Sequence, residues 1–235
     1  MIKDKVWIND VLRYRNPKIP RHGSIRLDKS ERLSDFEDGF FTDFINSLTQ
    51  EDFIAYPETN RLISKLAKYH NISEDNIFLT PGIDAAIKTF YEISVMPEDE
   101  VLITTPSFPM YSVYAGLFGA RTLEISYNKN LKFDFQGMLN SVSEKTALVL
   151  LANPNSPIGN YLETELIEEL VLKCERYGVP ILVDEAYSEF SPGSAISLAT
   201  KHPNLGVART FSKAMGGAGI RVGYVIGDYE LVKKL

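Results

Sequence analysis

A lysine, a cluster of glycines and an arginine lie close together near the end of the sequence, in the stretch 209-RTFSKAMGGAGIRVGY-224. Lys213 precedes three glycines that fall within four residues, and Arg221 follows the lysine by eight positions. Glycines at this density weaken a helix, but they let the backbone come close to a ligand. The stretch therefore predicts a site that combines a reactive amine, a close backbone and a fixed positive charge.

The elements that must position this site alternate along the chain. Strands are expected at residues 76–80, 101–105, 121–127, 147–153, 179–187, 206–212 and 221–227, and helices at 39–48, 59–69, 84–94, 110–118, 134–143 and 164–178. Several of the strands are apolar throughout, which is typical of strands covered on both faces. The fold class is therefore expected to be α/β, with three α/β/α layers around a mostly parallel sheet of seven strands.

Polar or aromatic residues follow five of the expected strands. They are Gly82 and Asp84 after 76–80, Phe108 after 101–105, Asn155 and Ser156 after 147–153, Asp184 and Tyr187 at the end of 179–183, and Ser212 and Lys213 after 206–210. Each has an ordinary structural explanation when taken alone, since a strand-end aspartate often caps a helix and a lysine is usually solvated. Ligands of open α/β sheets bind beyond the carboxyl ends of the strands, so five such ends on one edge favour a binding site.

These residue types suit a phosphorylated aromatic aldehyde. A lysine forms a Schiff base with an aldehyde, Phe108 can stack on a ring, and a buried Asp184 can keep a ring nitrogen protonated. Helix-start N–H groups, hydroxyls and a guanidinium bind phosphate. The residues that offer these groups are Gly82, Ile83, Asp84, Thr210, Ser212 and Arg221. The set predicts pyridoxal 5'-phosphate (PLP) as the cofactor.

In these motifs the sequence resembles the fold type I PLP-dependent enzymes of aminotransferase class I/II, and most of all the histidinol-phosphate aminotransferases. The resemblance runs from about Tyr56 to Asp228, and it rests chiefly on Ser212-Lys213 with RVGY (221–224) and on VDEAY (183–187). It implies transamination between small molecules, in which an amino acid or amino phosphate is the donor and an oxo compound the acceptor.

The resemblance also implies a role for each matching residue. Lys213 would hold PLP as an aldimine and move the proton at the substrate Cα. Asp184 would pair with the ring nitrogen, Tyr187 would hydrogen-bond the ring's phenolic oxygen, and Phe108 would stack on the ring. Tyr56 matches a tyrosine that reaches the cofactor of the partner subunit, so the resemblance implies a homodimer.

The sequence departs from the family pattern in two places. The family commonly has N-P-x-N-P-T-G, whereas this chain has Asn153-Pro154-Asn155-Ser156-Pro157-Ile158-Gly159, so either Ser156 or Asn155 would contact the phenolic oxygen. The family also continues into a smaller C-terminal domain, which this sequence does not include. The expected organisation is an N-terminal arm at 1–30 and a PLP-binding large domain at 31–235.

Two other functions remain open at this stage. A decarboxylase of a phosphorylated amino acid would use the same residues, because the reaction depends on which Cα bond the substrate contacts align. A lobe that holds cofactor or a partner without turnover is the alternative of another class.

Composition narrows the range of partners. A net charge of −6 over 235 residues gives no electrostatic support for nucleic-acid binding. The single cysteine, Cys174, is expected to be a buried hydrophobe, and with no signal-peptide pattern or membrane-span run it indicates a cytoplasmic protein. His22, His70 and His202 have no metal-ligand spacing, and we expect them at the surface.

Overall fold

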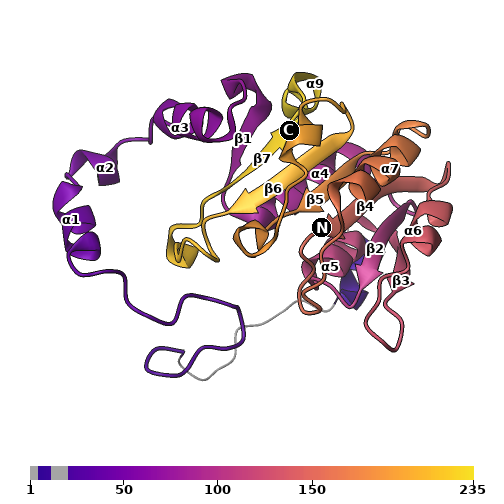
Figure 1. The fold of residues 1–235 in the computed structure, drawn as a ribbon, viewed down its shortest axis with the longest axis horizontal. Helices are drawn as coiled ribbons and strands as arrows, with labels where there is room; N and C mark the ends of the chain where they lie inside the picture. The colour runs from indigo at the N-terminus through magenta and orange to yellow at the C-terminus, as the bar shows by residue number, and fades with distance from the viewer. Residues whose placement is uncertain (1–4, 12–20) are drawn as a thin grey trace.

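The computed structural model of the chain describes residues 5–11 and 21–235 and is built on one sheet (Figure 1). Its strands are β1 (Ile77–Thr80), β2 (Glu100–Thr105), β3 (Arg121–Ser126), β4 (Thr146–Ala152), β5 (Ile181–Asp184), β6 (Leu205–Thr210) and β7 (Gly223–Gly227). They lie in the order β1-β7-β6-β5-β4-β2-β3. β7 pairs antiparallel with β1 and β6, and the other pairs are parallel. The mostly parallel seven-stranded sheet is confirmed.

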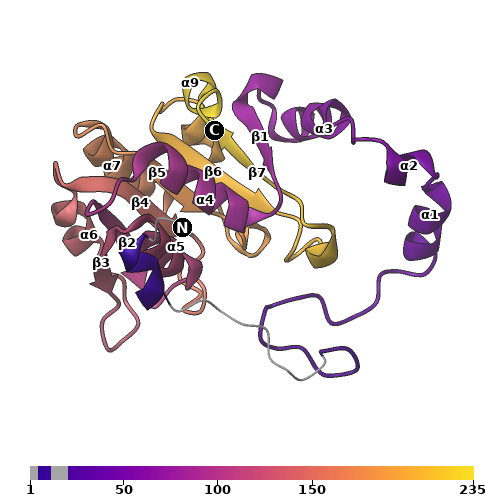
Figure 2. The same cartoon turned by 180° about the vertical axis from the view of Figure 1, so that it is seen from behind.

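Helices cover both faces of this sheet (Figures 1 and 2). One face packs against α3 (Asn60–His70), α6 (Phe135–Ser141), α7 (Thr164–Glu175) and α8 (Ile196–Ala199), and the other against α4 (Ile83–Ser94), α5 (Met110–Phe118) and α9 (Tyr229–Val232). Within β4, Val149 and Leu151 belong to the first cluster, and Leu148 and Leu150 to the second. This alternation follows from the two-residue period of a strand. The α/β/α layers are therefore confirmed.

The covering helices follow from their apolar spacing. In α7, Ile167, Leu170, Val171 and Cys174 are buried, and they recur at i, i+3, i+4 and i+7. This spacing puts them on one side of the helix, where burying each large side chain contributes about 1.5–3 kcal/mol. Cys174 is fully buried, as expected, and burial raises the pKa of its thiol to about 12. Cys174 is therefore a core side chain.

Two strands near the expected site are shorter than predicted. β5 stops at Asp184 and not at Tyr187, because the Asp184 carboxylate accepts the Ala186 N–H at 3.0 Å and turns the chain. β7 begins at Gly223 because Arg221 takes a left-handed conformation with φ of 54°. In both places the chain departs from strand geometry at a residue that the sequence analysis assigned to the site, Asp184 in one case and Arg221 in the other.

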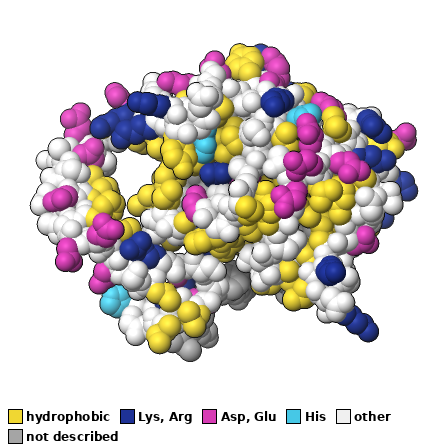
Figure 3. Space-filling view, viewed as in Figure 1, with side chains coloured by type: hydrophobic (Ala, Val, Ile, Leu, Met, Phe, Trp, Pro, Cys, Tyr) yellow, Lys and Arg dark blue, Asp and Glu magenta, His cyan; other side chains and the backbone are white. Residues whose placement is uncertain are grey.

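Residues 21–59, termed here the outer segment, run away from the sheet body (residues 60–235) and return to it at α3 (Figure 1). They include α1 (Phe40–Ser47) and α2 (Glu51–Ile54), neither of which buries a residue. The space-filling view shows an opening between this segment and the sheet body (Figure 3). Part of the expected arm at 1–30 lies outside the described residues, and the division into arm and large domain stays a prediction.

Candidate active site

The sheet topology brings the predicted strand ends to one edge. β1 is parallel to β6 because both are antiparallel to β7, and β6, β5, β4 and β2 are parallel to one another. The carboxyl ends of these five strands therefore share one edge of the sheet. The residues that follow them, from Gly82 to Lys213, lie along that edge.

Asp184 ends the central strand β5 and is 5% exposed. Its Oδ2 accepts the Tyr111 hydroxyl at 2.8 Å, and its Oδ1 accepts the Ala186 N–H at 3.0 Å. Burial raises the pKa of Asp184 to about 6, although the hydrogen bonds and the positive charge of Lys213 act in the opposite direction. At neutral pH the site therefore holds a buried carboxylate that gains from a cationic partner.

Tyr111 is a functional candidate that the sequence analysis missed. It lies on α5, three residues after Phe108, and its side chain is fully buried. The Phe108 and Tyr111 rings meet edge to face, with centroids 5.8 Å apart. A buried tyrosine hydroxyl needs a polar partner, so the position of Tyr111 in an apolar helix next to the strand ends was the available signal.

The start of α4 and Arg221 form the second part of the site. Gly82 precedes the helix with φ of 86° and ψ of 175°, and no side chain caps the first turn. A Cβ at Gly82 would overlap the Arg221 guanidinium, whose Cζ would be 3.2 Å away. The guanidinium therefore packs directly on the glycine, beside N–H groups of the helix start. Such a helix start together with an arginine is a strong anion-binding arrangement.

Hydroxyl groups complete this second part. Arg221 Nη1 donates to Ser212 Oγ at 3.2 Å, and Thr210 Oγ1 bonds to Ser212 Oγ at 3.0 Å. Asp84 lies in the first turn of α4, and its buried Oδ1 has no hydrogen-bond partner among the described residues. Ile83 follows Gly82 as the first residue of the helix, so the predicted residues at this end are all brought together.

Lys213 lies between β6 and the outer segment. Its Nζ donates to the backbone carbonyl of Lys29 at 2.7 Å and lies 5.5 Å from the centre of the Tyr187 ring. The amine therefore faces the turn that follows β5, where Asp184 is located.

The asparagine run after β4 divides into a structural and a candidate functional residue. Asn153 exchanges two hydrogen bonds with the backbone of Leu162, which fixes the loop. Asn155 is buried, and its amide Nδ2 donates to Thr104 and Ser107, two residues the sequence analysis did not single out. Asn155 Oδ1 is buried and has no hydrogen-bond partner in the described part of the chain, whereas Ser156 is only half-buried.

Comparison with known proteins decides the family. The family model described as aminotransferase class I and II matches residues 43–235. The chain belongs to this family. Histidinol-phosphate aminotransferase of Staphylococcus carnosus is 37% identical over 188 residues, and that of Thermococcus gammatolerans is 34% identical over 214. The matched parts are 77% and 90% of this chain but 53% and 61% of those proteins, so the chain spans between half and two thirds of their length.

Solved structures of aminotransferases share the fold. Histidinol-phosphate aminotransferase of Sinorhizobium meliloti, solved with pyridoxal-5'-phosphate, is 28% identical with a TM-score of 0.71, over 78% of this chain and 51% of that one. The same enzyme of Clostridium acetobutylicum is 24% identical with a TM-score of 0.72, over 82% and 59%. The fold class predicted from the sequence is thus the fold of this aminotransferase family.

Tyr56 is the one predicted residue that the described structure keeps away from the others. It lies between α2 and α3 in the outer segment, and its side chain is fully exposed. It therefore contacts none of the site residues of its own chain.

Two of the three histidines are not surface residues. His202 has a 12% exposed side chain near Glu168 and Glu175, and half-buried His70 lies 2.9 Å from the Tyr224 hydroxyl, whereas His22 is exposed. The surface prediction is wrong for His70 and His202, because both pack against neighbouring elements. The described residues hold no group of three or more His, Cys, Asp or Glu placed for a metal ion.

The helices of the described residues can be compared with the length and hydrophobicity of a membrane span. In residues 5–11 and 21–235, no helix has both the length and the apolar character that crossing a bilayer requires. The expected cytoplasmic location stays a prediction.

Proposed function

We propose that this chain binds PLP at the shared edge of the sheet and takes part in transamination. The amino group of a small amino donor would pass to a small oxo acceptor. The observation that carries this proposal is the meeting, on one edge, of a buried carboxylate, a lysine amine and a helix start with an arginine against it. PLP needs a partner for its ring nitrogen, its aldehyde and its phosphate, and the three groups correspond.

The residues around the start of α4, the phosphate end of the site, suit the phosphate group of PLP. A phosphate at the start of α4 would accept main-chain N–H groups that no side chain caps, and Arg221 would donate as a charged fork. Thr210 and Ser212 would add hydroxyls. Gly82 allows the approach, because any Cβ there would occupy the space beside the guanidinium.

The residues around Asp184, the ring end of the site, suit the aromatic ring of PLP. Asp184 at neutral pH would hold a proton at the ring nitrogen, and the paired charge would offset the cost of keeping the carboxylate buried. Phe108 would cover one face of the ring, with Tyr111 holding Asp184 in place. The unpartnered Oδ1 of Asn155 marks that residue, rather than Ser156, as the one poised to contact a ligand.

The chain's own residues have distinct tasks in the reaction. PLP, when bound, supplies an aldehyde that takes up the amine and a ring that accepts electrons from the substrate Cα. Lys213 Nζ would hold the cofactor at its aldehyde carbon until the substrate amine takes that place, and the freed amine would then move the proton at Cα. Tyr187, whose ring lies 5.5 Å from Nζ, would orient the amine and hydrogen-bond the phenolic oxygen.

A homodimer is part of the proposal. α1 exposes Phe40, Phe41, Phe44 and Ile45, and Tyr56 is fully exposed further along the same outer segment. An apolar helix face of this kind is unfavourable in water unless something covers it. A second copy of the chain that covered the outer segment would bring Tyr56 towards its neighbour's phosphate site.

The test is a half-reaction on the chain as it stands. PLP is added, excess is removed, and a panel of amino donors, including histidinol phosphate, is supplied while chromatography follows the conversion of bound PLP to pyridoxamine phosphate. We expect conversion by at least one donor and none in Lys213→Ala. Release of carbon dioxide in place of conversion would show decarboxylation, and PLP binding without any product would show a lobe that does not turn over.

A further inference from the structure

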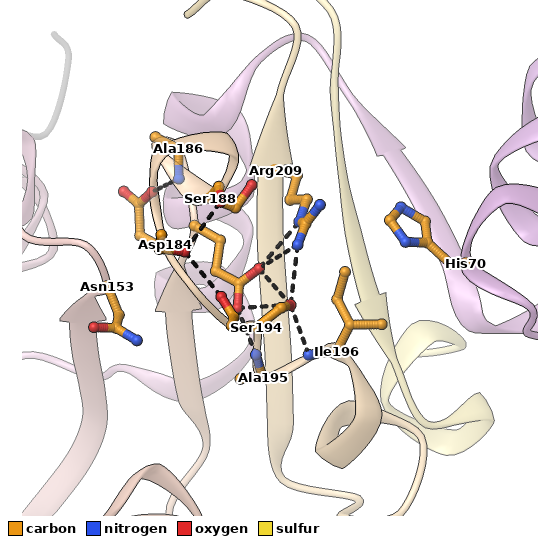
Figure 4. A network of polar contacts seen from close by, with 12 residues as sticks. His70, Asn153, Asp184, Ala186, Ser188, Ser194, Ala195, Ile196 and Arg209 are labelled. Carbon is orange, nitrogen blue, oxygen red and sulfur yellow. Dashed lines mark hydrogen bonds and ion pairs between the residues drawn. The ribbon is translucent and has the colours of Figure 1, made fainter. Parts of the chain in front are cut away.

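A buried ion pair lies behind the proposed site, on the other face of the sheet (Figure 4). Glu185 is 1% exposed and follows Asp184 directly, while Arg209 directly precedes Thr210. Successive residues of an extended chain point to opposite faces. The site residues Asp184 and Thr210 therefore face α4 and α5, while Glu185 and Arg209 face α8.

The Glu185 carboxylate is fully supplied with donors. Arg209 donates to Oε2 through Nε at 3.0 Å and Nη2 at 2.8 Å, and the Ala195 N–H donates to Oε1 at 2.6 Å. Ser194 Oγ lies within 3.0 Å of both carboxylate oxygens and of Arg209 Nη2. Both Arg209 donors meet at Oε2 while the Ala195 N–H holds Oε1, so the orientation of the carboxylate is fixed at each of its two oxygens.

The pair is placed where it can control the spacing of the site. It joins the chain immediately after β5 to the end of β6, and the Glu185 N–H donates to the Ala208 carbonyl at 2.9 Å alongside it. One residue away on each strand are Asp184, at the ring end of the proposed site, and Thr210, at the phosphate end. A change in the angle of the pair would therefore move the two ends relative to each other.

Arg209 is also held from its other side. Tyr224 of β7 is its sheet neighbour, and the Tyr224 hydroxyl bonds to His70 of α3. Burial lowers the pKa of His70 to about 4, and the positive charge of Arg209 acts in the same direction, so the imidazole is neutral at physiological pH. Arg209 thus has a carboxylate on one side and neutral rings on the other, which leaves Glu185 as its charged partner in this network.

Stability alone does not account for such a pair. Desolvating two charges costs as much as their attraction returns, and apolar pairs of similar volume often replace buried ion pairs at no loss of stability. The Glu185–Arg209 pair directly neighbours Asp184 and Thr210 in sequence. Its effect on the positions of these two site residues explains its presence better than a contribution to stability does.

We propose that Glu185 and Arg209 are positioning residues that set the distance between the ring end and the phosphate end of the site. The proposal rests on the proposed function for what the site binds. Neither side chain would contact the cofactor, and both would act through Asp184 and Thr210.

The experiment separates positioning from stability with an apolar pair. The double variant Glu185→Leu/Arg209→Met keeps the buried volume but loses the fixed angle, and Glu185→Gln keeps the shape but loses the charge. Glu98→Gln is the control, because it removes an ion pair with Arg121 whose side chains are both more than 70% exposed. Each is made in the full 235-residue chain.

Two properties are measured beside the melting temperature. The first, in the cofactor-free chain, is hydrogen exchange at the Ala186 and Asn153 amides, which donate to the Asp184 carboxylate and carbonyl. The second is the dissociation constant for PLP. We expect the double variant to melt near the wild-type temperature, to exchange these amides faster, and to bind PLP about tenfold more weakly, as when groups that orient ligands are removed. The control is expected to match the wild type in all three.

The proposal is overturned if the double variant folds stably and its two amides keep wild-type protection. If the double variant does not fold, Glu185→Gln carries the same comparison, with amide exchange set against its melting temperature. If the wild-type chain fails to bind PLP, the proposed function fails, whereas amide exchange in the cofactor-free chain still decides whether the pair positions Asp184.

Discussion

The sheet body and the outer segment differ in which side chains they bury. In the sheet body, Asp184, Asn155 and Glu185 are buried polar residues with specific partners, and apolar side chains fill two cores. In the outer segment, α1 and α2 bury nothing and large apolar side chains are exposed. The contacts that frame the site are therefore made within one chain, whereas the described structure leaves the large apolar side chains of the outer segment uncovered.

Ion pairs show the same difference. Arg209 and Glu185 are held in the interior, while Arg21 bonds to Asp28 at 2.7 Å and to Glu31 at 2.5 Å where all three are partly exposed. Exposed pairs contribute little, typically below about 1 kcal/mol. The outer segment has its own local ion pairs, and it meets the body at the site in two places: Lys213 Nζ donates to the Lys29 carbonyl, and a Cβ at Gly216 would lie 2.7 Å from Cδ of Arg32.

Among the variants, Asp184→Asn, a substitution in the sheet body, is expected to have the largest effect on turnover. Loss of the ring-nitrogen partner should lower turnover by about a hundredfold or more. The thermal stability of the variant, in contrast, should exceed that of the wild type at pH 7. The folded-state pKa of about 6 lies above the carboxyl group's ordinary value of 3.8, so ionising Asp184 lowers the stability of the wild type as pH rises from about 4 to about 6.

Thermal melting of the cofactor-free chains at several pH values checks the stability half of this prediction. Asp184→Asn should lack the loss between pH 4 and pH 6 and should melt higher than the wild type at pH 7. A variant that melts lower at pH 7 would contradict the view that the carboxylate is kept at a cost to stability.

Gly82→Ala is expected to come next. The new Cβ would overlap the Arg221 guanidinium, and φ of 86° with ψ of 175° is strained for alanine by about 1–3 kcal/mol. PLP affinity should fall about tenfold, because the phosphate end is displaced. Gly159→Ala is the control, since φ is 80° there and no described residue lies within 4 Å of the added Cβ. Equal losses of PLP affinity in both variants would exclude a specific role for Gly82.

Tyr111→Phe should have a moderate effect. It removes a 2.8 Å hydrogen bond to Asp184, and because that bond lowers the carboxyl pKa, the pKa should rise above about 6. A bond to a charged group is worth about 1.5–3 kcal/mol, so turnover should fall roughly tenfold, most at low pH. Tyr91→Phe, which loses a buried bond to the Tyr111 carbonyl, is the matched control and should leave the pH profile of turnover unchanged.

The smallest effect on the body is expected from Phe41→Glu in α1. The side chain is 58% exposed, so the free energy of unfolding of the monomer should change by less than about 0.5 kcal/mol. Self-association, measured by sedimentation, should weaken. Leu131→Glu starts from a side chain that is also 58% exposed, but outside the outer segment, and should leave association unchanged. Unaltered sedimentation of Phe41→Glu would break the comparison between the two regions.

The sequence predicted the position of those site residues that follow directly from the order of the strands and from residue type. Gly82, Phe108, Asp184 and Lys213 were placed on one edge because parallel strands end together, and the sheet confirms it. Tyr111, Thr104 and Arg209 were missed because their roles depend on contacts between elements far apart in the sequence. β5 and β7 were predicted too long at this edge, since Asp184 turns the chain through its own side chain and Arg221 takes a left-handed conformation that residue type does not reveal.

The central claim is that Lys213 is the residue to which PLP bonds. The most direct test is to incubate the chain with PLP, reduce with borohydride, digest it and locate the modified lysine by mass spectrometry. We expect modification concentrated on the peptide that contains Lys213 and absent from Lys213→Ala. Modification spread over surface lysines, unchanged in Lys213→Ala, would contradict it.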